Sequence, residues 1–187
     1  MYLEKENTAI LYQEIINHFY PTDTELRHLL LLHSRQVADK ALSIVHRHPE
    51  LGADITFVEE GAMLHDIGIF LTSAPSIHCH GSQPYICHGI LGANLLRSMG
   101  HETFARVCER HTGAGISLQD ILSQQLPLPH QDFLPETIEE QIICYADKFF
   151  SKSHPEHTKT VEQAVNSLKK FGSDGTARFL RWAERFE

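Results

Sequence analysis

The sequence predicts an all-α protein that folds as a single-domain bundle of helices. Two observations indicate this fold class. Wherever apolar residues recur with a clear period, they lie three or four residues apart, as on one face of a helix, and no segment shows the alternation of a half-buried strand. The length of 187 residues suits one domain, and neither a long linker nor an internal repeat divides it, so we expect one domain over residues 1–187.

Proline, glycine and capping residues set the limits of the expected helices. Pro21 separates the first helix from the second, and Pro49 follows the end of the second. Thr22 or Asp23 can cap the second helix, and Gly100 stops the fourth. The expected helices cover about residues 3–19, 22–48, 54–69, 88–99, 102–111, 118–124, 136–151, 156–171 and 176–185.

Two segments between these helices are predicted to be loops. Residues 72–87 and most of residues 112–135 hold clusters of proline and glycine, which favour irregular structure. The first of these segments would join the third and fourth helices. Because loops often carry function, we expect it to form a lid or rim over a site.

The charge composition excludes some partners. Asp and Glu number 24 against 16 Lys and Arg, so the formal net charge is −8, and no basic cluster interrupts it. Such a chain lacks the electrostatic footprint expected for binding a nucleic acid polymer or an anionic membrane. The N-terminal residues show no apolar signal segment, and the four cysteines form no CxxC pair. We expect a cytoplasmic protein that binds neither membrane nor nucleic acid polymer.

Histidine and aspartate occupy core-facing positions on five of the expected helices. In the second helix, for example, His33 lies three residues after Leu30 and four residues before Val37. One histidine on such a stripe is usually a hydrogen-bonded core residue, but a buried carboxylate without a partner is costly. One shared metal centre accounts for all of these residues together. Its expected ligands are His33, His65, Asp66, His88, His111 and Asp147.

This ligand set also predicts the kind of metal. Imidazole and carboxylate together suit Fe, Mn, Co, Ni or Zn better than Ca. Six protein ligands exceed what one catalytic ion with an open position uses, and two ions bridged by a carboxylate fit better. We therefore expect two divalent metal ions, with Fe or Mn first and Zn, Co or Ni as alternatives.

The order of these residues resembles the signature of the HD phosphohydrolase superfamily. His33 is followed by the run Leu64 to Gly68, which reads LHDIG, and then by the distant Asp147. The additional His88 and His111 resemble the members with a longer motif that hold two metals. The block from residue 109 to residue 116 is similar to a group of small stand-alone HDIG-motif proteins.

The resemblance covers about residues 27–152 and implies an HD-type helical bundle around the metal centre, with the helices of residues 156–186 packed on it. It implies that Asp66 bridges two ions. In that arrangement His33, His65 and Asp147 would hold one ion, and His88 and His111 would hold the other. Most members of the superfamily hydrolyse phosphate esters or anhydrides.

We therefore expect hydrolysis of a phosphate ester or anhydride in a small molecule such as a nucleotide, by attack of a metal-bound hydroxide. Lys148 and Arg110 are the candidates to contact the phosphate, and a solvated surface charge is the alternative for each. A di-iron oxygenase and a non-catalytic nucleotide sensor fit the same ligands. The aromatic stripe of Phe149, Phe150, Phe171, Phe179 and Trp182 fits either the core or a homodimer contact.

Overall fold

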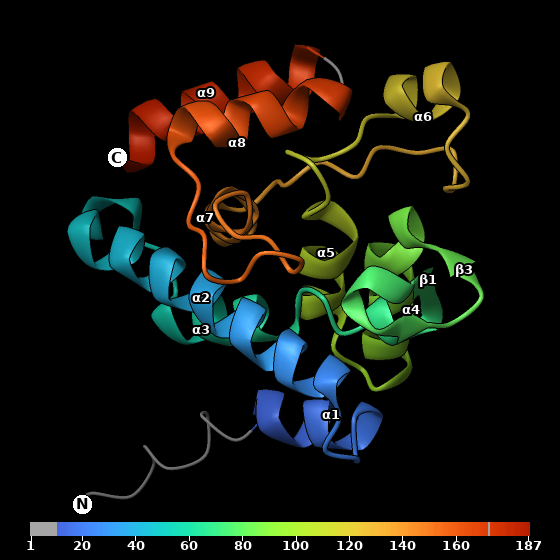
Figure 1. Ribbon diagram of the computed structural model, residues 1–187. Helices are drawn as coiled ribbons and strands as arrows, with labels where there is room; N and C mark the ends of the chain where they lie inside the picture. The colour runs from blue at the N-terminus through green and yellow to red at the C-terminus, as the bar shows by residue number, and fades with distance from the viewer. Residues whose placement is uncertain (1–10, 172) are drawn as a thin grey trace, which may run out of the picture.

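Helices dominate the structure, a computed structural model that describes residues 11–171 and 173–187 (Figure 1). The expected start of the first helix near residue 3 lies outside this range. The helices are α1 (Leu11–Phe19), α2 (Glu25–Arg47), α3 (Ile55–Leu64), α4 (His88–Ser98), α5 (Glu102–Arg110), α6 (Leu118–Gln124), α7 (Ile138–Asp147), α8 (Val161–Leu168) and α9 (Ser173–Phe186). The predicted all-α fold class is confirmed.

The third helix is shorter than the sequence pattern indicated. It ends at Leu64, five residues before the predicted end. Beyond it the chain tightens into three-residue turns, in which Ile67 N–H donates to the Leu64 carbonyl and Ile69 N–H to the Asp66 carbonyl, both at 3.0 Å. His65 and Asp66 therefore lie in a turn, where their side chains can face a common centre without the fixed angular step of a helix.

Helices α7 and α8 also differ from the predicted limits. Helix α7 ends at Asp147 instead of near residue 151. Helix α8 begins at Val161 instead of near residue 156, because Thr160 and Gln163 form a capping box there, and a 3₁₀ turn (Lys169–Phe171) extends it. The segment between α7 and α8 is therefore a loop and not part of a helix.

The prediction that the chain has no strands is wrong for the segment 72–87. This segment contains β1 (Thr72–Ala74), β2 (Cys79–His80) and β3 (Gln83–Pro84). The strand order is β2-β1-β3, with β1 antiparallel to β2 and parallel to β3. Strands of two or three residues are too short to show an alternating pattern, so hydropathy could not reveal them.

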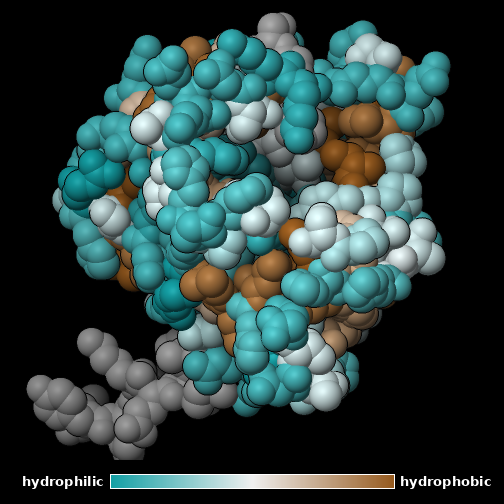
Figure 2. All heavy atoms as spheres, viewed as in Figure 1, coloured by the Kyte–Doolittle hydropathy of each residue, from teal (hydrophilic) through white to brown (hydrophobic). Residues whose placement is uncertain are grey.

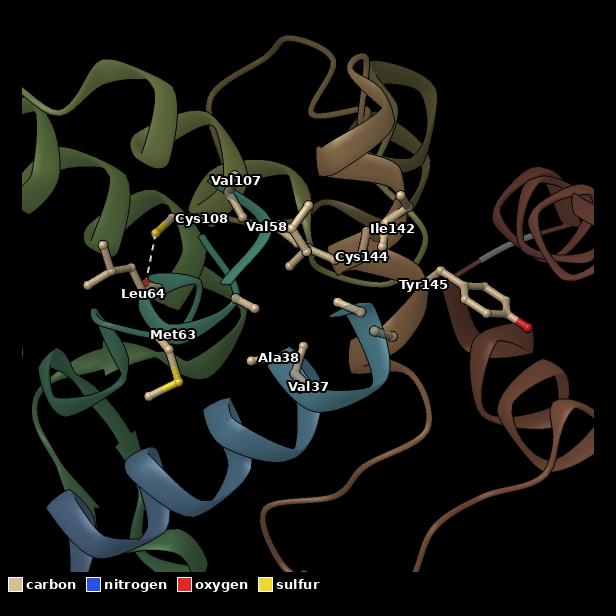
Figure 3. Packing of buried hydrophobic residues seen from close by; sticks show 14 of the residues in the cluster. Val37, Ala38, Val58, Met63, Leu64, Val107, Cys108, Ile142, Cys144 and Tyr145 are labelled. Atoms are coloured by element: carbon tan, nitrogen blue, oxygen red, sulfur yellow. Dashed lines mark hydrogen bonds between the residues drawn. The ribbon is translucent and has the colours of Figure 1, made fainter. Parts of the chain in front are cut away.

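The core lies where α2, α3, α5 and α7 meet, and Figure 3 shows their apolar side chains facing one another. Helix α9 packs on α7, where Tyr145 stacks on Phe179 with ring centroids 4.8 Å apart. Of the predicted aromatic stripe, Phe149, Phe179 and Trp182 are buried in this core, whereas the side chain of Phe171 lies outside the described residues.

The visible face of the molecule is mostly hydrophilic, with small apolar patches (Figure 2). In the described part of the chain, no helix combines the length and the apolar character needed to cross a bilayer.

Two glycines allow the helices to approach closely around the site. A Cβ atom on Gly89 would lie 2.5 Å from the Cys108 carbonyl oxygen, and one on Gly68 would lie 2.3 Å from the Gly92 nitrogen. Both contacts are with backbone atoms, which cannot easily move. These glycines therefore bring α4 against α5 and against the turn that follows α3.

Candidate metal centre

All six predicted ligands meet at one buried cluster, and five of them lie at or next to helix ends. His65 and Asp66 directly follow α3, and His88 is the first residue of α4. His111 directly follows α5, and Asp147 is the last residue of α7. His33 alone lies inside a long helix, α2. None of the six is more than 8% exposed, so the cluster is shielded from bulk water.

The six side chains form two groups that share Asp66. The two-carboxylate group contains His33, His65, Asp66 and Asp147, and the one-carboxylate group contains Asp66, His88 and His111. Within each group, one ligand atom per residue lies within 4.8 Å of the others. The grouping matches the partition that the family resemblance implied.

The two carboxylate oxygens of Asp66 face different groups. Its Oδ2 lies 3.0 Å from His65 Nε2 and 3.2 Å from His33 Nε2. Its Oδ1 lies 3.4 Å from His88 Nε2 and 3.5 Å from His111 Nε2. A carboxylate placed in this way can bind two cations at once, with one oxygen directed to each.

Three of the histidines are oriented by hydrogen bonds to backbone carbonyls. The Nδ1 atoms of His65, His88 and His111 lie 2.6, 2.7 and 2.7 Å from the carbonyl oxygens of the residues three positions earlier. A carbonyl can only accept, so each Nδ1 donates and each Nε2 is directed to the cluster, where its deprotonated form can bind a cation.

A metal ion fits this arrangement better than hydrogen bonding does. His88 Nε2 and His111 Nε2 lie 3.0 Å apart, so two lone pairs face each other unless a cation or a proton lies between them. Asp66 Oδ1 is buried and completes no hydrogen bond within the described residues, whereas Oδ2 pairs with the Lys152 ammonium. Imidazole nitrogens and carboxylate oxygens together are suitable ligands for a divalent transition metal.

The electrostatics of the two groups differ. Burial alone would lower the pKa of His65, but Asp66 and Asp147 outweigh it and raise this pKa to about 9. Burial and the neighbouring His111 lower the pKa of His88 to about 3. Burial opposes ionisation of the two aspartates, yet His65 holds the pKa of Asp66 well below its usual value, and Lys148 does the same for Asp147.

A cavity of about 400 Å³ opens onto the cluster. His88, His111 and Asp147 lie in its lining, so both groups are accessible from it. Residues of the segment 72–87 line one side of this cavity, where the sequence predicted a lid or rim over the site. On this side Tyr85 stacks on the ring of His88 at a centroid distance of 4.7 Å. Burial raises the pKa of Tyr85 to about 12, so its hydroxyl stays protonated and can donate a hydrogen bond.

The two cationic residues proposed to contact phosphate have different positions. Lys148 lines the cavity, where its ammonium lies 2.6 Å from Asp147 Oδ2 and donates to the His111 carbonyl at 3.0 Å. Arg110 does not line the cavity. Its guanidinium bonds the Leu134 carbonyl and pairs with Glu136 and Glu140. The expectation that Arg110 contacts phosphate is therefore corrected, because these carboxylates hold its guanidinium away from the site.

Sequence reasoning missed Lys152. Its ammonium lies 2.5 Å from Asp66 Oδ2, and it also lines the cavity. Burial would lower the pKa of Lys152, but Asp66 outweighs burial and raises it. Lys152 lies in the loop after α7, so no helical spacing in the sequence indicated that it reaches the site.

Comparison with known families agrees with this geometry. The family model described as HD domain matches residues 30–151. The chain belongs to the HD-domain family. All six residues of the cluster fall inside the segment that the family model matches.

Among curated relatives, an uncharacterized protein of Methanocaldococcus jannaschii is 38% identical over 115 residues, which cover 61% of this chain and 59% of that protein. A tRNA (cytidine(56)-2'-O)-methyltransferase of Thermoplasma volcanium is 30% identical over 84% of this chain and 41% of its own length. A tRNA (cytidine(56)-2'-O)-methyltransferase of Picrophilus torridus is 36% identical over 66% of this chain and 32% of its own length. The chain thus spans less than two thirds of each of these relatives.

Among solved structures, the HD domain of the phosphodiesterase PgpH of L. monocytogenes is similar, with a TM-score of 0.50 and 15% identity. The match covers 90% of this chain and 92% of that one. At this level of identity the likeness shows a shared fold.

Proposed function

We propose that the protein is a metal-dependent phosphohydrolase that acts on a phosphate ester or anhydride of a small molecule, with two divalent ions, Fe or Mn first, in the two groups that share Asp66. One observation carries the proposal. The Nε2 atoms of His88 and His111 face each other at 3.0 Å while their Nδ1 atoms donate to carbonyls, and the shared Asp66 directs one oxygen to each group.

The chain's own residues would position the substrate and the ions. Divalent cations supply a water of lowered pKa and neutralise charge on phosphate oxygens. His65, His88 and His111 present fixed Nε2 atoms, so the ligands need little rearrangement. Lys148 neutralises the outer oxygen of Asp147, and the protonated Tyr85 hydroxyl can donate to a phosphate oxygen or to a leaving group at the cavity wall.

The cavity favours a small anionic substrate over a nucleic acid polymer. A volume of about 400 Å³ lies in the range of small-molecule sites. The surrounding surface belongs to a chain with a net charge of −8, and a long polyanion would be repelled by it. The tRNA methyltransferases among the relatives are matched over 41% and 32% of their lengths, so their names do not assign methyl transfer to the matched segment.

Metal analysis combined with a substrate screen tests the proposal. We expect about two ions per chain after loading with Mn or Fe, and phosphate release from a panel of nucleotides and phosphate esters. The variant Asp66→Ala should lose both ions and the activity. Asp39→Ala is the matched control, because Asp39 is an exposed carboxylate on α2 whose one ion pair among the described residues is with Arg35 at 3.8 Å.

Other results would contradict hydrolysis in specific ways. Two ions with oxygen consumption, a mixed-valent iron signal and no phosphate release from any compound would indicate the di-iron oxygenase. Tight nucleotide binding without turnover of any substrate would indicate the sensor.

A further inference from the structure

Lysine is concentrated in the lining of the cavity. Four of the chain's seven lysines line it, namely Lys148, Lys152, Lys159 and Lys170. Asp147 is the one acidic residue in the lining among the described residues, although the chain has 24 acidic residues in all. Like charges repel one another, so a lysine of the lining that no carboxylate pairs favours the binding of an anion.

Lys159 differs from Lys148 and Lys152, which pair with Asp147 and Asp66. Within the described part of the chain, the half-buried Lys159 ammonium makes no hydrogen bond and no ion pair. Its place is nonetheless fixed, because its backbone N–H donates to the Phe149 carbonyl at 2.8 Å and so ties the loop to the end of α7. Burial and the neighbouring lysines lower the pKa of Lys159, whereas Asp147 acts to raise it.

The part of the lining that contains Lys159 lies outside the segment that the HD-domain model matches. The HD model ends at residue 151, so Lys159, Lys170 and helix α8 lie beyond it. The lining also contains the apolar side chains of Ile77, Phe150 and Leu168. The lining of the cavity thus combines residues of the cluster suited to metals, apolar side chains and lysines.

We propose that Lys159, with Lys170 in the same lining, is a subsite for a second phosphate group of the substrate, distinct from the phosphate at the metal cluster. The substrate class is therefore a small molecule with two separated phosphates, such as a nucleoside bisphosphate whose nucleoside contacts Ile77 and Leu168. This inference rests on the proposed function, because it takes the metal cluster as the site of the first phosphate.

Calorimetric titration of the full, Mn-loaded chain tests the subsite. The probes are adenosine 5'-monophosphate and adenosine 3',5'-bisphosphate, with ligand integrity checked by chromatography. We expect the bisphosphate to bind about tenfold more tightly, as one charge-assisted contact allows. Lys159→Gln should bring the ratio of the two dissociation constants close to one, and Lys159→Arg should keep it. Lys169→Gln removes an exposed neighbour that does not line the cavity, and should leave the ratio unchanged.

Equal affinity of the unaltered chain for the two probes would overturn the subsite, as would equal weakening of both probes by Lys159→Gln. Hydrolysis of bis(p-nitrophenyl) phosphate, which has a single phosphate, reports on the proposed function separately. If the chain hydrolyses this compound but binds the two adenosine probes with equal dissociation constants, the subsite is rejected and the proposed function stands. A ratio that depends on Lys159 in a chain that hydrolyses no phosphate compound would support the subsite and reject the hydrolase.

Discussion

The two ligand groups share Asp66, yet they differ in charge. The two-carboxylate group adds Asp147 to Asp66 and has Lys148 and Lys152 at its edge. The one-carboxylate group has only the shared Asp66 opposite two imidazoles. In the first group the carboxylates hold a proton on His65, with a pKa of about 9, whereas in the second group His88 is neutral, with a pKa of about 3.

The two groups have similar ligands, but they differ in how strongly they attract a cation and in whether a proton must leave first. The two-carboxylate group attracts a cation strongly and must release a proton from His65 to bind it. The one-carboxylate group has its imidazoles ready at neutral pH but offers less negative charge. We therefore expect the first ion to bind in the two-carboxylate group.

The largest expected effect is the loss of metal ions. Replacing the shared ligand Asp66 should remove both ions, whereas replacing a ligand of one group should remove the ion of that group. We expect Asp66→Asn to lose both ions and to lower kcat by more than about a thousandfold, because it removes the bridge. His88→Asn should retain about one ion per chain, bound in the two-carboxylate group. Metal analysis of the purified variants measures this difference. If His88→Asn lost both ions, the two groups would not be separable.

The second effect concerns pH in the metal-free protein. Burial lowers the pKa of His65, but the carboxylates raise it from 6.5 to about 9, so the folded chain keeps a proton that the unfolded chain releases. This contribution to stability is complete below pH 6.5 and is lost as the pH rises through about 9. We expect the free energy of unfolding to fall by at most about 3 kcal/mol over this window.

Denaturant titration of chelator-treated protein at several pH values measures this slope. His65→Asn should flatten it, whereas His88→Asn should keep it, because His88 titrates near pH 3. A flat profile in the unaltered chain would mean that the carboxylates do not hold the proton of His65.

The third effect tests how packing positions the one-carboxylate group. Gly89→Ala places a methyl group 2.5 Å from the Cys108 carbonyl oxygen, so α4 and α5 must separate. We expect a loss of about 2 kcal/mol in stability and weaker binding of the second ion. Thermal unfolding and metal titration measure both. Gly175→Ala is the control, since its nearest neighbour is Ala114 Cβ at 4.0 Å, and it should be neutral or slightly stabilising.

The smallest effect concerns Lys152. Its ammonium lies 2.5 Å from Asp66 Oδ2, so it competes electrostatically with a cation in the two-carboxylate group. We expect Lys152→Gln to tighten binding of the first ion by up to about tenfold. Competition with a metal-sensitive dye measures this affinity. Weaker binding in Lys152→Gln would show that Lys152 supports the site and does not oppose the cation.

Much of this arrangement could be predicted from the sequence, because ligands on apolar helical stripes reveal both the helices and the residues that face the core. His33 on its stripe and the HDIG run are of this kind. The ends of α3 and α7 could not be read in this way, since tertiary contacts and three-residue turns end a helix without a local signal. The short strands had no periodicity to detect.

Charged residues near the site were the harder part of the prediction. Arg110 precedes the ligand His111 and Lys148 follows the ligand Asp147, but of the two only Lys148 lines the cavity. The carboxylates that pair with Arg110 are Glu140, in the first turn of α7, and Glu136, two residues before α7 begins, and no sequence pattern predicts that pairing. Lys152 and Lys159 belong to the loop after α7, whose path depends on the fold of the whole chain.

The hydrogen bonds from Nδ1 of His65, His88 and His111 share one local pattern, in which each ring is tethered to the carbonyl three residues before it. The conformational entropy of these rings is therefore lost when the chain folds and not when it takes up a cation. Cation uptake should then be rapid and nearly free of backbone rearrangement, so that apo and loaded forms superimpose closely at these three rings.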